Sequence, residues 1–574
     1  MKLDLRLFLA ASLAPIVGAS SSGPVVDLDY ASYQGYSEAA TGLNIWKGIR
    51  YASPPVGQLR WQPPTPPAKN TSQVIQAVAQ PPLCPQSGAA GTPAVYGFIS
   101  GPGDEDCLFL NVYAPPGASD LPVFVWIHGG GYGLFGALYD PSPLMNTNNN
   151  GFITVEIQYR LGAFGFLSSA EVHNQGTPNA GLLDQRFALE WVQQYIGSFG
   201  GDPNQVTIGG ESAGAGSIIA ASPYSPPIYP YDGPIPTAYY EQFAEQAGCG
   251  PSAPARSNYN TTFDCLVAAP SDTLQNASGI VSTSGLFGTF AFLPVVDGDL
   301  IQQLPSAQLL NSQISGQRIL VGNNANDGVP LSNPNVIGRD AFNDYLSQTF
   351  PNLTGYALSW LNLLYDTTNS QPTDDGPRFD TSGTWPPTAI NQSEMATGLQ
   401  QTVFNIFAET TFDCPAQWLA EAFGAFRQAW KYQYSVTPAY HGADLNAYFN
   451  MSSSWPSAGF NHAFQKIWGN FIINSTPFIP LSDATANNSQ AVVPVGQNGY
   501  LDWPQFRPMS PWQMDLNETG GTVSPVVVTP NLTFYVREGD DVVNHFSLAN
   551  AYTWEGGRGL RCAFWRVVGD LIPL

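Results

Sequence analysis

The fold is decided by Val206-Thr207-Ile208-Gly209-Gly210-Glu211-Ser212-Ala213-Gly214, where a short β-branched run leads into glycines and a serine. Small residues then continue to Ala221, which predicts a strand, a tight turn and a helix with Ser212 on the turn. Glycines stand two positions on either side of the serine, where side chains would keep the strand and helix apart. The free N–H groups at the start of such a helix would face a developing oxyanion. The stretch therefore predicts an exposed nucleophilic serine.

Around this stretch, strands and helices alternate along the chain. The continuous apolar runs typical of strands buried on both faces are 123–127 and 152–157, and later strands are expected at 318–321 and 532–536. Between 180 and 198 the apolar residues recur at helical spacing: Leu182, Leu183, Leu189, Val192 and Ile196. This alternation predicts an α/β fold with a mainly parallel central sheet covered by helices on both faces.

The pattern G-x-S-x-G is weak when it stands alone, because a chain this rich in glycine and serine holds roughly half a match by chance. A second motif supports it. His128-Gly129-Gly130-Gly131-Tyr132 follows the strand ending at Ile127 and is similar to the HGGG loop that supplies oxyanion N–H groups. A glycine run alone would equally suit a flexible turn, but its position upstream of the elbow favours the oxyanion loop.

A nucleophilic serine also needs a general base and an acid that orients it, expected in the order serine, acid, histidine. His441, in a loop after Pro438, is the candidate base, although a single histidine is as often structural. Asp327, before Gly328 on a loop that follows a strand, is the candidate acid, and Asp297 and Asp299 compete with it. The alternative for Asp327 is a turn residue. The residues alone leave these choices open.

Composition and charge narrow the class of protein. The formal net charge of −23 disfavours nucleic-acid binding, which depends on neutralising phosphates. Hydrophobic residues make up 43% and charged residues 11%, as expected of a packed globular chain. We find no internal repeat and no long Gly/Ser linker. We therefore expect one catalytic domain over residues 20–574.

The N-terminus predicts export. Lys2 and Arg6 precede an apolar run over 7–17, and small residues at Val17 and Ala19 suit cleavage of a 1–19 signal peptide. Six cysteines suit disulfides in an oxidising compartment. Glycosylation sequons begin at Asn70, Asn260, Asn276, Asn352, Asn391, Asn450, Asn474, Asn487, Asn517 and Asn531. No later apolar stretch reaches transmembrane length, so we expect a secreted, extracellular glycoprotein.

Several further segments resemble one family. Residues 105–112 (Glu-Asp-Cys-Leu-Phe-Leu-Asn-Val) resemble one signature of the type-B carboxylesterase/lipase family, which includes cholinesterases and fungal lipases. Segments 181–185, 199–203 and 210–217 resemble the other signature, and 294–298 also falls in family order. The resemblance covers nearly all of the mature chain and implies an α/β-hydrolase fold.

The resemblance also implies roles for single residues. It implies Ser212 as nucleophile, Asp327 as acid and His441 as base, with Asp297 a structural turn residue. The oxyanion donors would be the N–H groups of Gly130, Gly131 and Ala213, and Glu211 would be a buried carboxylate beside the serine. The implied disulfides are Cys84–Cys107, Cys249–Cys265 and Cys414–Cys562.

Departures from the family concern the substrate. Most members carry Glu where this chain has Asp327, so the acid loop must lie closer to His441. The aromatic residues that bind choline esters in relatives are missing: no Trp lies between Cys84 and Cys107, and Pro330 and Leu331 follow the acid. The acyl-pocket positions read Gly288 and Phe290. We therefore expect Gly288, Phe290 and Leu331 to line a roomy pocket for neutral esters.

These features predict a secreted serine hydrolase that cleaves small-molecule or lipid carboxylic esters with a medium or long acyl group through an acyl-enzyme on Ser212. No metal or organic cofactor is expected. One alternative is a lipase acting on insoluble acylglycerols. The other is a non-catalytic adhesion protein of the same fold, although such proteins have lost the serine. The sequence leaves the natural ester and the oligomeric state open.

Overall fold

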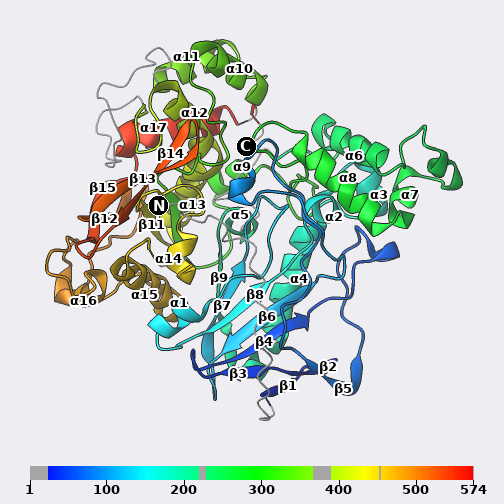
Figure 1. Cartoon of the computed structure of the whole chain (residues 1–574), viewed down its shortest axis with the longest axis horizontal. Helices are drawn as coiled ribbons and strands as arrows, with labels where there is room; N and C mark the ends of the chain where they lie inside the picture. The colour runs from blue at the N-terminus through cyan, green and yellow to red at the C-terminus, as the bar shows by residue number, and fades with distance from the viewer. Residues whose placement is uncertain (1–22, 219–227, 366–388, 452–453, 570, 573–574) are drawn as a thin grey trace.

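The computed structural model describes residues 23–218, 228–365, 389–451, 454–569 and 571–572. The expected signal peptide over 1–19 lies outside this range. The described chain forms two main sheets, a small N-terminal sheet and a hairpin (Figure 1). The small sheet contains β1 (Val25–Asp27), β2 (Ala31–Gln34) and β5 (Asn70–Gln76).

The first main sheet has six strands in the order β3-β4-β6-β8-β7-β9. Its strands are β3 (Tyr36–Glu38), β4 (Leu43–Arg50), β6 (Phe109–Ala114), β7 (Leu121–Ile127), β8 (Ile153–Ile157) and β9 (Gly201–Gly210). Pairing is antiparallel from β3 to β8 and parallel between β8, β7 and β9. The parallel strands end at the edge that carries the HGGG loop and Ser212.

The second main sheet has four strands in the order β10-β11-β12-β15. They are β10 (Arg318–Asn324), β11 (Gln428–Tyr434), β12 (Trp512–Thr519) and β15 (Val543–Asn550). The first three are parallel, and β15 is antiparallel to β12. Within the described residues no strand pairing joins β9 to β10, so the two sheets meet at an open seam.

The strand expected at 532–536 lies in neither main sheet. It is β14 (Leu532–Glu538), which pairs with β13 (Thr522–Thr529) in a two-stranded antiparallel hairpin. Its apolar residues resemble those of a sheet strand because Leu532 and Phe534 pack into a separate small core with Phe404. The other expected strands are present, and β9 is longer than the sequence indicated.

Helices cover both sheets. The longer ones are α4 (Ala180–Tyr195), α6 (Pro234–Gln246), α8 (Ser271–Thr283), α10 (Arg339–Thr349), α11 (Gly355–Leu364), α12 (Gly398–Ala408), α13 (Cys414–Phe426), α15 (Ala458–Asn474) and α17 (Trp554–Val567). Shorter ones are α1 (Ser142–Thr147), α2 (Gly162–Phe166), α3 (Ala170–Gln175), α5 (Ala213–Ile218), α7 (Thr262–Ala268), α9 (Pro305–Leu310), α14 (Leu445–Phe449) and α16 (Leu481–Ala484). In Figure 1, α3, α6, α7 and α8 gather on the right, and α10, α11, α12 and α17 lie at the upper left.

Side chains on β7 alternate between two cores, as the period of two in a strand requires. Val123 and Val125 face the core that contains α4, whereas Phe124 and Trp126 face the core that contains α1 and α15. The second core also receives Trp430 and other residues of the second sheet. Helix α15 therefore packs against one face of both main sheets and contributes to a core that they share.

Three disulfides link the loops and helices around these layers. They are Cys84–Cys107, Cys249–Cys265 and Cys414–Cys562, the same pairs that the family resemblance implies. The third joins α13 to α17 across a sequence separation of 148 residues. Its position fixes the C-terminal helix to the outer face of the second sheet.

Candidate active site

Ser212 lies on a sharp turn between β9 and α5. Its φ is 55°, in the left-handed region that a non-glycine residue adopts only at a cost in energy. A Cβ on Gly210 would lie 2.7 Å from the carbonyl oxygen of Ile127, and a Cβ on Gly214 would lie 2.0 Å from it. Only glycine fits at either position, as the sequence indicated. The tight packing holds the serine side chain in its strained position at the end of the sheet.

A chain of hydrogen bonds joins Ser212, His441 and Asp327. The serine Oγ lies 2.9 Å from His441 Nε2, and His441 Nδ1 lies 3.1 Å from Asp327 Oδ1. A carboxylate only accepts, so Nδ1 carries the proton and Nε2 is left to accept the proton of the serine hydroxyl. Asp327 and His441 are buried, with exposures of 4% and 9%. The arrangement is that of a nucleophile, a base and an orienting acid.

The acid and histidine loops are fixed to one another by backbone contacts. The N–H of Asn326 donates to the carbonyl of Ala439 at 2.9 Å, and that of His441 donates to Val329 at 2.8 Å. Asp327 Oδ2 accepts the N–H of Asn324 at 2.6 Å. These contacts bring the shorter Asp side chain within reach of the imidazole.

The competing acid, Asp297, lies in a turn of its own. Its Oδ1 accepts the backbone N–H groups of Asp299 and Ile301, and its Oδ2 accepts the side chain of Asn179. These contacts occupy both oxygens of the carboxylate. Asp297 therefore acts as a structural turn residue in this structure.

The environment of His441 suits a neutral base. Burial lowers the pKa of His441, and the nearby Glu211 and Asp444 oppose this effect. Phe412 stacks on the imidazole with ring centroids 4.1 Å apart. Burial therefore favours the neutral imidazole before reaction, and the neighbouring carboxylates, when ionised, are placed to stabilise its cation once it takes a proton.

Glu211 is one of these carboxylates. Its Oε1 lies 3.3 Å from His441 Nε2, and burial raises the pKa of Glu211 to about 8. Asp444, three residues after His441, accepts the side chain of Asn324 at 3.1 Å. Burial also raises the pKa of Asp444. No local sequence pattern indicates Asp444, because its proximity to the imidazole depends on how the loop turns back.

The HGGG loop lies against the nucleophile. A Cβ on Gly129 would lie 2.9 Å from the Cβ of Ser212, and Gly130 and Gly131 have φ values of 100° and 61°. Ala213 is the first residue of α5, so its N–H has no acceptor within the helix. The three expected donors thus lie on two backbone segments that meet at Ser212.

The predicted acyl-binding residues lie beside this loop. A Cβ on Gly131 would lie 2.1 Å from the ring of Phe290, so the ring packs directly on the glycine. A Cβ on Gly288 would lie 1.8 Å from the carbonyl oxygen of Leu331. The structure therefore brings Gly288, Phe290 and Leu331 to the same side of the site as the oxyanion loop.

A cavity of about 960 Å³ follows the seam between β9 and β10. Ser212, Asp327 and His441 are among the residues that line it. Gly131 and Phe290 do not belong to its lining among the described residues. The cavity therefore reaches the serine from a different side than the oxyanion loop does.

Glu394 is a further buried residue near the site that the sequence did not indicate. Its Oε2 accepts the hydroxyl of Thr437 at 2.7 Å, and its Oε1 accepts the side chain of Asn326 at 3.4 Å. Burial raises the pKa of Glu394 to about 8. The carboxyl group connects the acid loop to the histidine loop.

No group of three or more His, Cys, Asp or Glu side chains in the described ranges is placed to hold a metal ion. No helix in the described part of the chain is long and apolar enough to cross a membrane.

Known proteins are similar to this chain over most of its length. The model of the Carboxylesterase family matches residues 22–525. Secreted lipase 1 of Botryotinia fuckeliana is 29% identical over 525 residues, covering 82% of this chain and 85% of the lipase. Carboxylesterase patB of Penicillium expansum is 28% identical over 555 residues, covering 83% and 92%. The crystal structure of Aspergillus niger EstA, 24% identical, superposes with a TM-score of 0.71 over 96% of this chain and 99% of EstA.

Proposed function

Because the chain belongs to the carboxylesterase family and is a carboxylic-ester hydrolase, we propose that Ser212, His441 and Asp327 are its catalytic triad. The α/β-hydrolase fold of the family places a nucleophile at the end of a parallel strand, and Ser212 has that position after β9. The single observation that carries the assignment is the hydrogen-bonded chain from Ser212 Oγ through His441 to Asp327.

The proposed reaction proceeds in two acyl-transfer steps. His441 Nε2 takes the proton of Ser212 as Oγ attacks the ester carbonyl, and Asp327 stabilises the resulting imidazolium. The N–H groups of Gly130, Gly131 and Ala213 hold the oxyanion. The imidazolium then protonates the leaving alcohol, and water attacks the acyl-enzyme by the same route in reverse.

The test is Ser212→Ala. We expect this variant to lose hydrolysis of p-nitrophenyl esters and labelling by a fluorophosphonate probe while its thermal unfolding stays close to that of the wild type. Labelling that persists in the variant would place the nucleophile elsewhere. The same probe separates an esterase from a non-catalytic adhesion protein, which would not react at all.

For the substrate we propose neutral esters with a medium or long acyl group. The basis is the sequence, which has no Trp between Cys84 and Cys107 and has Gly288 at a position that is aromatic in relatives that bind choline esters. A chain-length series of p-nitrophenyl esters, with butyrylcholine as the contrasting substrate, tests this. High turnover of butyrylcholine would contradict it.

A lipase is the second candidate, because relatives include Secreted lipase 1 of Botryotinia fuckeliana and the secreted triacylglycerol lipase LIP1 of Gibberella zeae. A lipase would show a rise in activity when an acylglycerol exceeds its solubility. An esterase would show saturation below that concentration.

We also propose that the chain is secreted as a single-domain glycoprotein. All six cysteines are paired, as in proteins of oxidising compartments. None of the ten sequon asparagines is fully buried in this structure. A mass shift on treatment with an endoglycosidase, and N-terminal sequencing of the secreted protein from Ser20, test the proposal.

A further inference from the structure

Lys431 is a lysine buried in the middle of β11, with an exposure of 1%. Its neighbours Trp430 and Tyr432 face the core that contains α15, so Lys431 faces the opposite side of the sheet. The same face carries Gln433 on β11 and Gln513 on β12, the residue opposite Lys431 in the strand register. A row of polar side chains here departs from the apolar pattern of a buried parallel strand, and such departures are typical of functional sites.

The ammonium group of Lys431 is held by two side-chain oxygens. Its Nζ donates to Asn323 Oδ1 at 2.7 Å and to Gln513 Oε1 at 3.0 Å. Both partners are neutral amides, so these contacts use two of the three N–H groups of the ammonium without neutralising its charge. The positive charge of Lys431 can therefore act on the carboxylate of Asp327, to which a series of hydrogen bonds leads.

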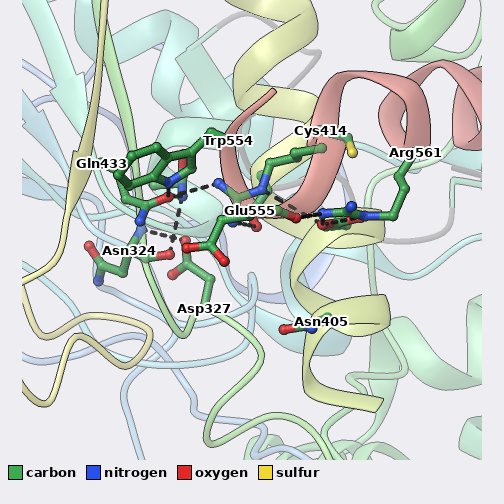
Figure 2. A network of polar contacts seen from close by, with 12 residues as sticks. Asn324, Asp327, Asn405, Cys414, Gln433, Trp554, Glu555 and Arg561 are labelled. Carbon is green, nitrogen blue, oxygen red and sulfur yellow. Dashed lines mark hydrogen bonds and ion pairs between the residues drawn. The ribbon is translucent and has the colours of Figure 1, made fainter. Parts of the chain in front are cut away.

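A short series of hydrogen bonds leads from Lys431 to Asp327. Asn323, which binds the ammonium, donates its amide to the carbonyl of Asn324 at 3.2 Å. The backbone N–H of Asn324 in turn donates to Asp327 Oδ2 at 2.6 Å. Lys431 thus binds Asn323, which in turn binds Asn324, and Asn324 binds Asp327 through Oδ2, the oxygen that faces away from His441. Figure 2 shows Asn324 and Asp327 close to Gln433 in this network.

A second cation approaches from α17. Arg558 Nη1 donates to Gln433 Oε1 at 2.8 Å, and its Nη2 lies 3.2 Å from Asp413 Oδ2. The charged groups that act on Asp327 are Arg558 and Lys431, which favour its ionised form, and Asp444 and Asp413, which oppose it. Glu211 and His441 face it from the elbow and the histidine loop. The backbone N–H of Asn324 and the cations from β11 and α17 therefore offset the burial of Asp327.

We propose that Lys431 is a positioning residue for the ester-hydrolysis reaction, whose buried charge keeps Asp327 ionised and therefore keeps His441 in the tautomer that accepts the proton of Ser212. The proposal rests on the proposed catalytic triad. It assigns the polar face of β11 a role in the chemistry that goes beyond its packing. Arg558 contributes to the same field, while its contact with Asp413 also joins α17 to the helical segment that precedes α13.

The directions in which the pKa values of Lys431 and Asp327 are shifted are consistent with this role. Burial and Arg558 lower the pKa of Lys431 to about 7, whereas burial raises the pKa of Asp327. The lysine charge is thus most complete on the acid side of neutrality, where Asp327 most needs a nearby cation to remain ionised. Without the lysine, Asp327 would take up a proton at a higher pH, and activity would therefore be lost at a higher pH on the acid limb of the pH profile.

The test compares Lys431→Met with Lys431→Arg and with Tyr434→Phe as the matched control. Tyr434 lies on the same strand and is equally buried, and its hydroxyl has no hydrogen-bond partner among the described residues. We expect Lys431→Met to move the acid limb of the kcat/KM profile upward by about one pH unit or more. Lys431→Arg should restore most of the shift, and Tyr434→Phe should follow the wild type. An unshifted limb in Lys431→Met would overturn the proposal.

A double-mutant cycle separates a charge effect from a structural one. In an Asp327→Asn background the carboxylate charge is already gone, so adding Lys431→Met should leave the residual kcat/KM unchanged. An equal loss in both backgrounds would show that Lys431 acts only through packing. Should Lys431→Met fail to fold, Lys431→Gln retains an amide donor to Asn323 and serves in the same comparison. Loss of fluorophosphonate labelling in Ser212→Ala tests the triad independently, so failure of the two proposals can be distinguished.

Discussion

Glu211 and Ser212 share one nitrogen of His441: the glutamate Oε1 lies 3.3 Å from Nε2, and the serine Oγ lies 2.9 Å from the same atom. The proton that leaves the serine therefore arrives beside a carboxyl group. Two neighbouring residues of the elbow thus serve the same imidazole, one as its reaction partner and the other through its charge.

Glu211→Gln tests the effect of that charge. Because burial raises the pKa of Glu211 to about 8, we expect kcat/KM for a neutral p-nitrophenyl ester to fall by about tenfold, equivalent to ~1.4 kcal/mol, above pH 8, where the imidazolium loses a nearby carboxylate, and to fall less near neutral pH. KM should change little, since the side chain acts on the charged transition state. The control is Glu190→Gln at an exposed position on α4, which should leave the kinetics unchanged. Wild-type kinetics in Glu211→Gln would contradict the prediction.

Asp327→Asn tests the charge of the acid, and Asp327→Glu tests the length of its side chain. The amide removes the charge that fixes the histidine tautomer, so we expect kcat to fall by about 10⁴ while the protein stays folded. The glutamate retains charge but adds a methylene in a site where Asp327 already contacts Asn324 and His441. We expect it to lose activity less severely and to unfold at a lower temperature than the wild type. A mild effect of the amide would move the role to another carboxylate.

Gly131→Ala tests the oxyanion loop. The new Cβ would lie 2.1 Å from the ring of Phe290, at a backbone φ of 61° that disfavours side chains. The loop must therefore shift, and we expect kcat to fall by about 10²–10³ through loss of an oxyanion donor. Burst kinetics would show whether acylation itself is slowed. Gly117→Ala is the control, because a Cβ there meets nothing within 4 Å although its φ is also positive.

The disulfides should differ in their contributions to stability. In the chain-entropy model, removal of the Cys414–Cys562 bridge, with its separation of 148 residues, destabilises by about 5 kcal/mol. Removal of Cys249–Cys265, with a separation of 16, destabilises by about 3 kcal/mol. Paired Cys→Ala variants unfolded in denaturant measure both values. The reverse ranking would show that strain or residual structure in the unfolded chain dominates.

Stability should also depend on pH through Glu156, which is buried in the middle of the first sheet. Burial raises the pKa of Glu156 from 4.5 to about 8. The folded protein thus holds a proton that the unfolded chain releases, so its contribution to stability is complete below about pH 4.5 and lost as the pH rises through about 8. We expect the difference in Tm between pH 5 and pH 8 to shrink in Glu156→Gln. Glu190→Gln, an exposed control, should retain the difference.

Sequence patterns predicted the part of the site that depends on local geometry. The elbow at Ser212 and the glycine loop at Gly130 are each formed by a few consecutive residues, and their backbone requirements appear directly as glycines. The helix expected over 180–198 and the strands expected over 123–127 and 152–157 are confirmed, because the helix has a regular apolar period and each strand is a continuous apolar run. The relatives confirm the family and its fold.

Long-range contacts could not be predicted in the same way. Lys431 and Glu394 reach the acid loop only after several separate segments have packed together, and no local pattern encodes that proximity. The strand over 532–536 was correctly expected, but its partner was not indicated, since an alternating apolar segment suits a hairpin as well as a sheet. The choice between Asp327 and Asp297 needed either the family or the observed hydrogen bonds.

The triad spans the seam between β9 and β10. Ser212 follows β9 of the first main sheet, whereas Asp327 and His441 follow β10 and β11 of the second, so the 2.9 Å contact between serine and histidine crosses the boundary between the sheets. A small slip of one sheet past the other would break this contact and leave the bond between His441 and Asp327 intact. Enzymatic turnover thus depends on the relative position of the two sheets. On heating, we expect activity to be lost at a lower temperature than the helical circular-dichroism signal.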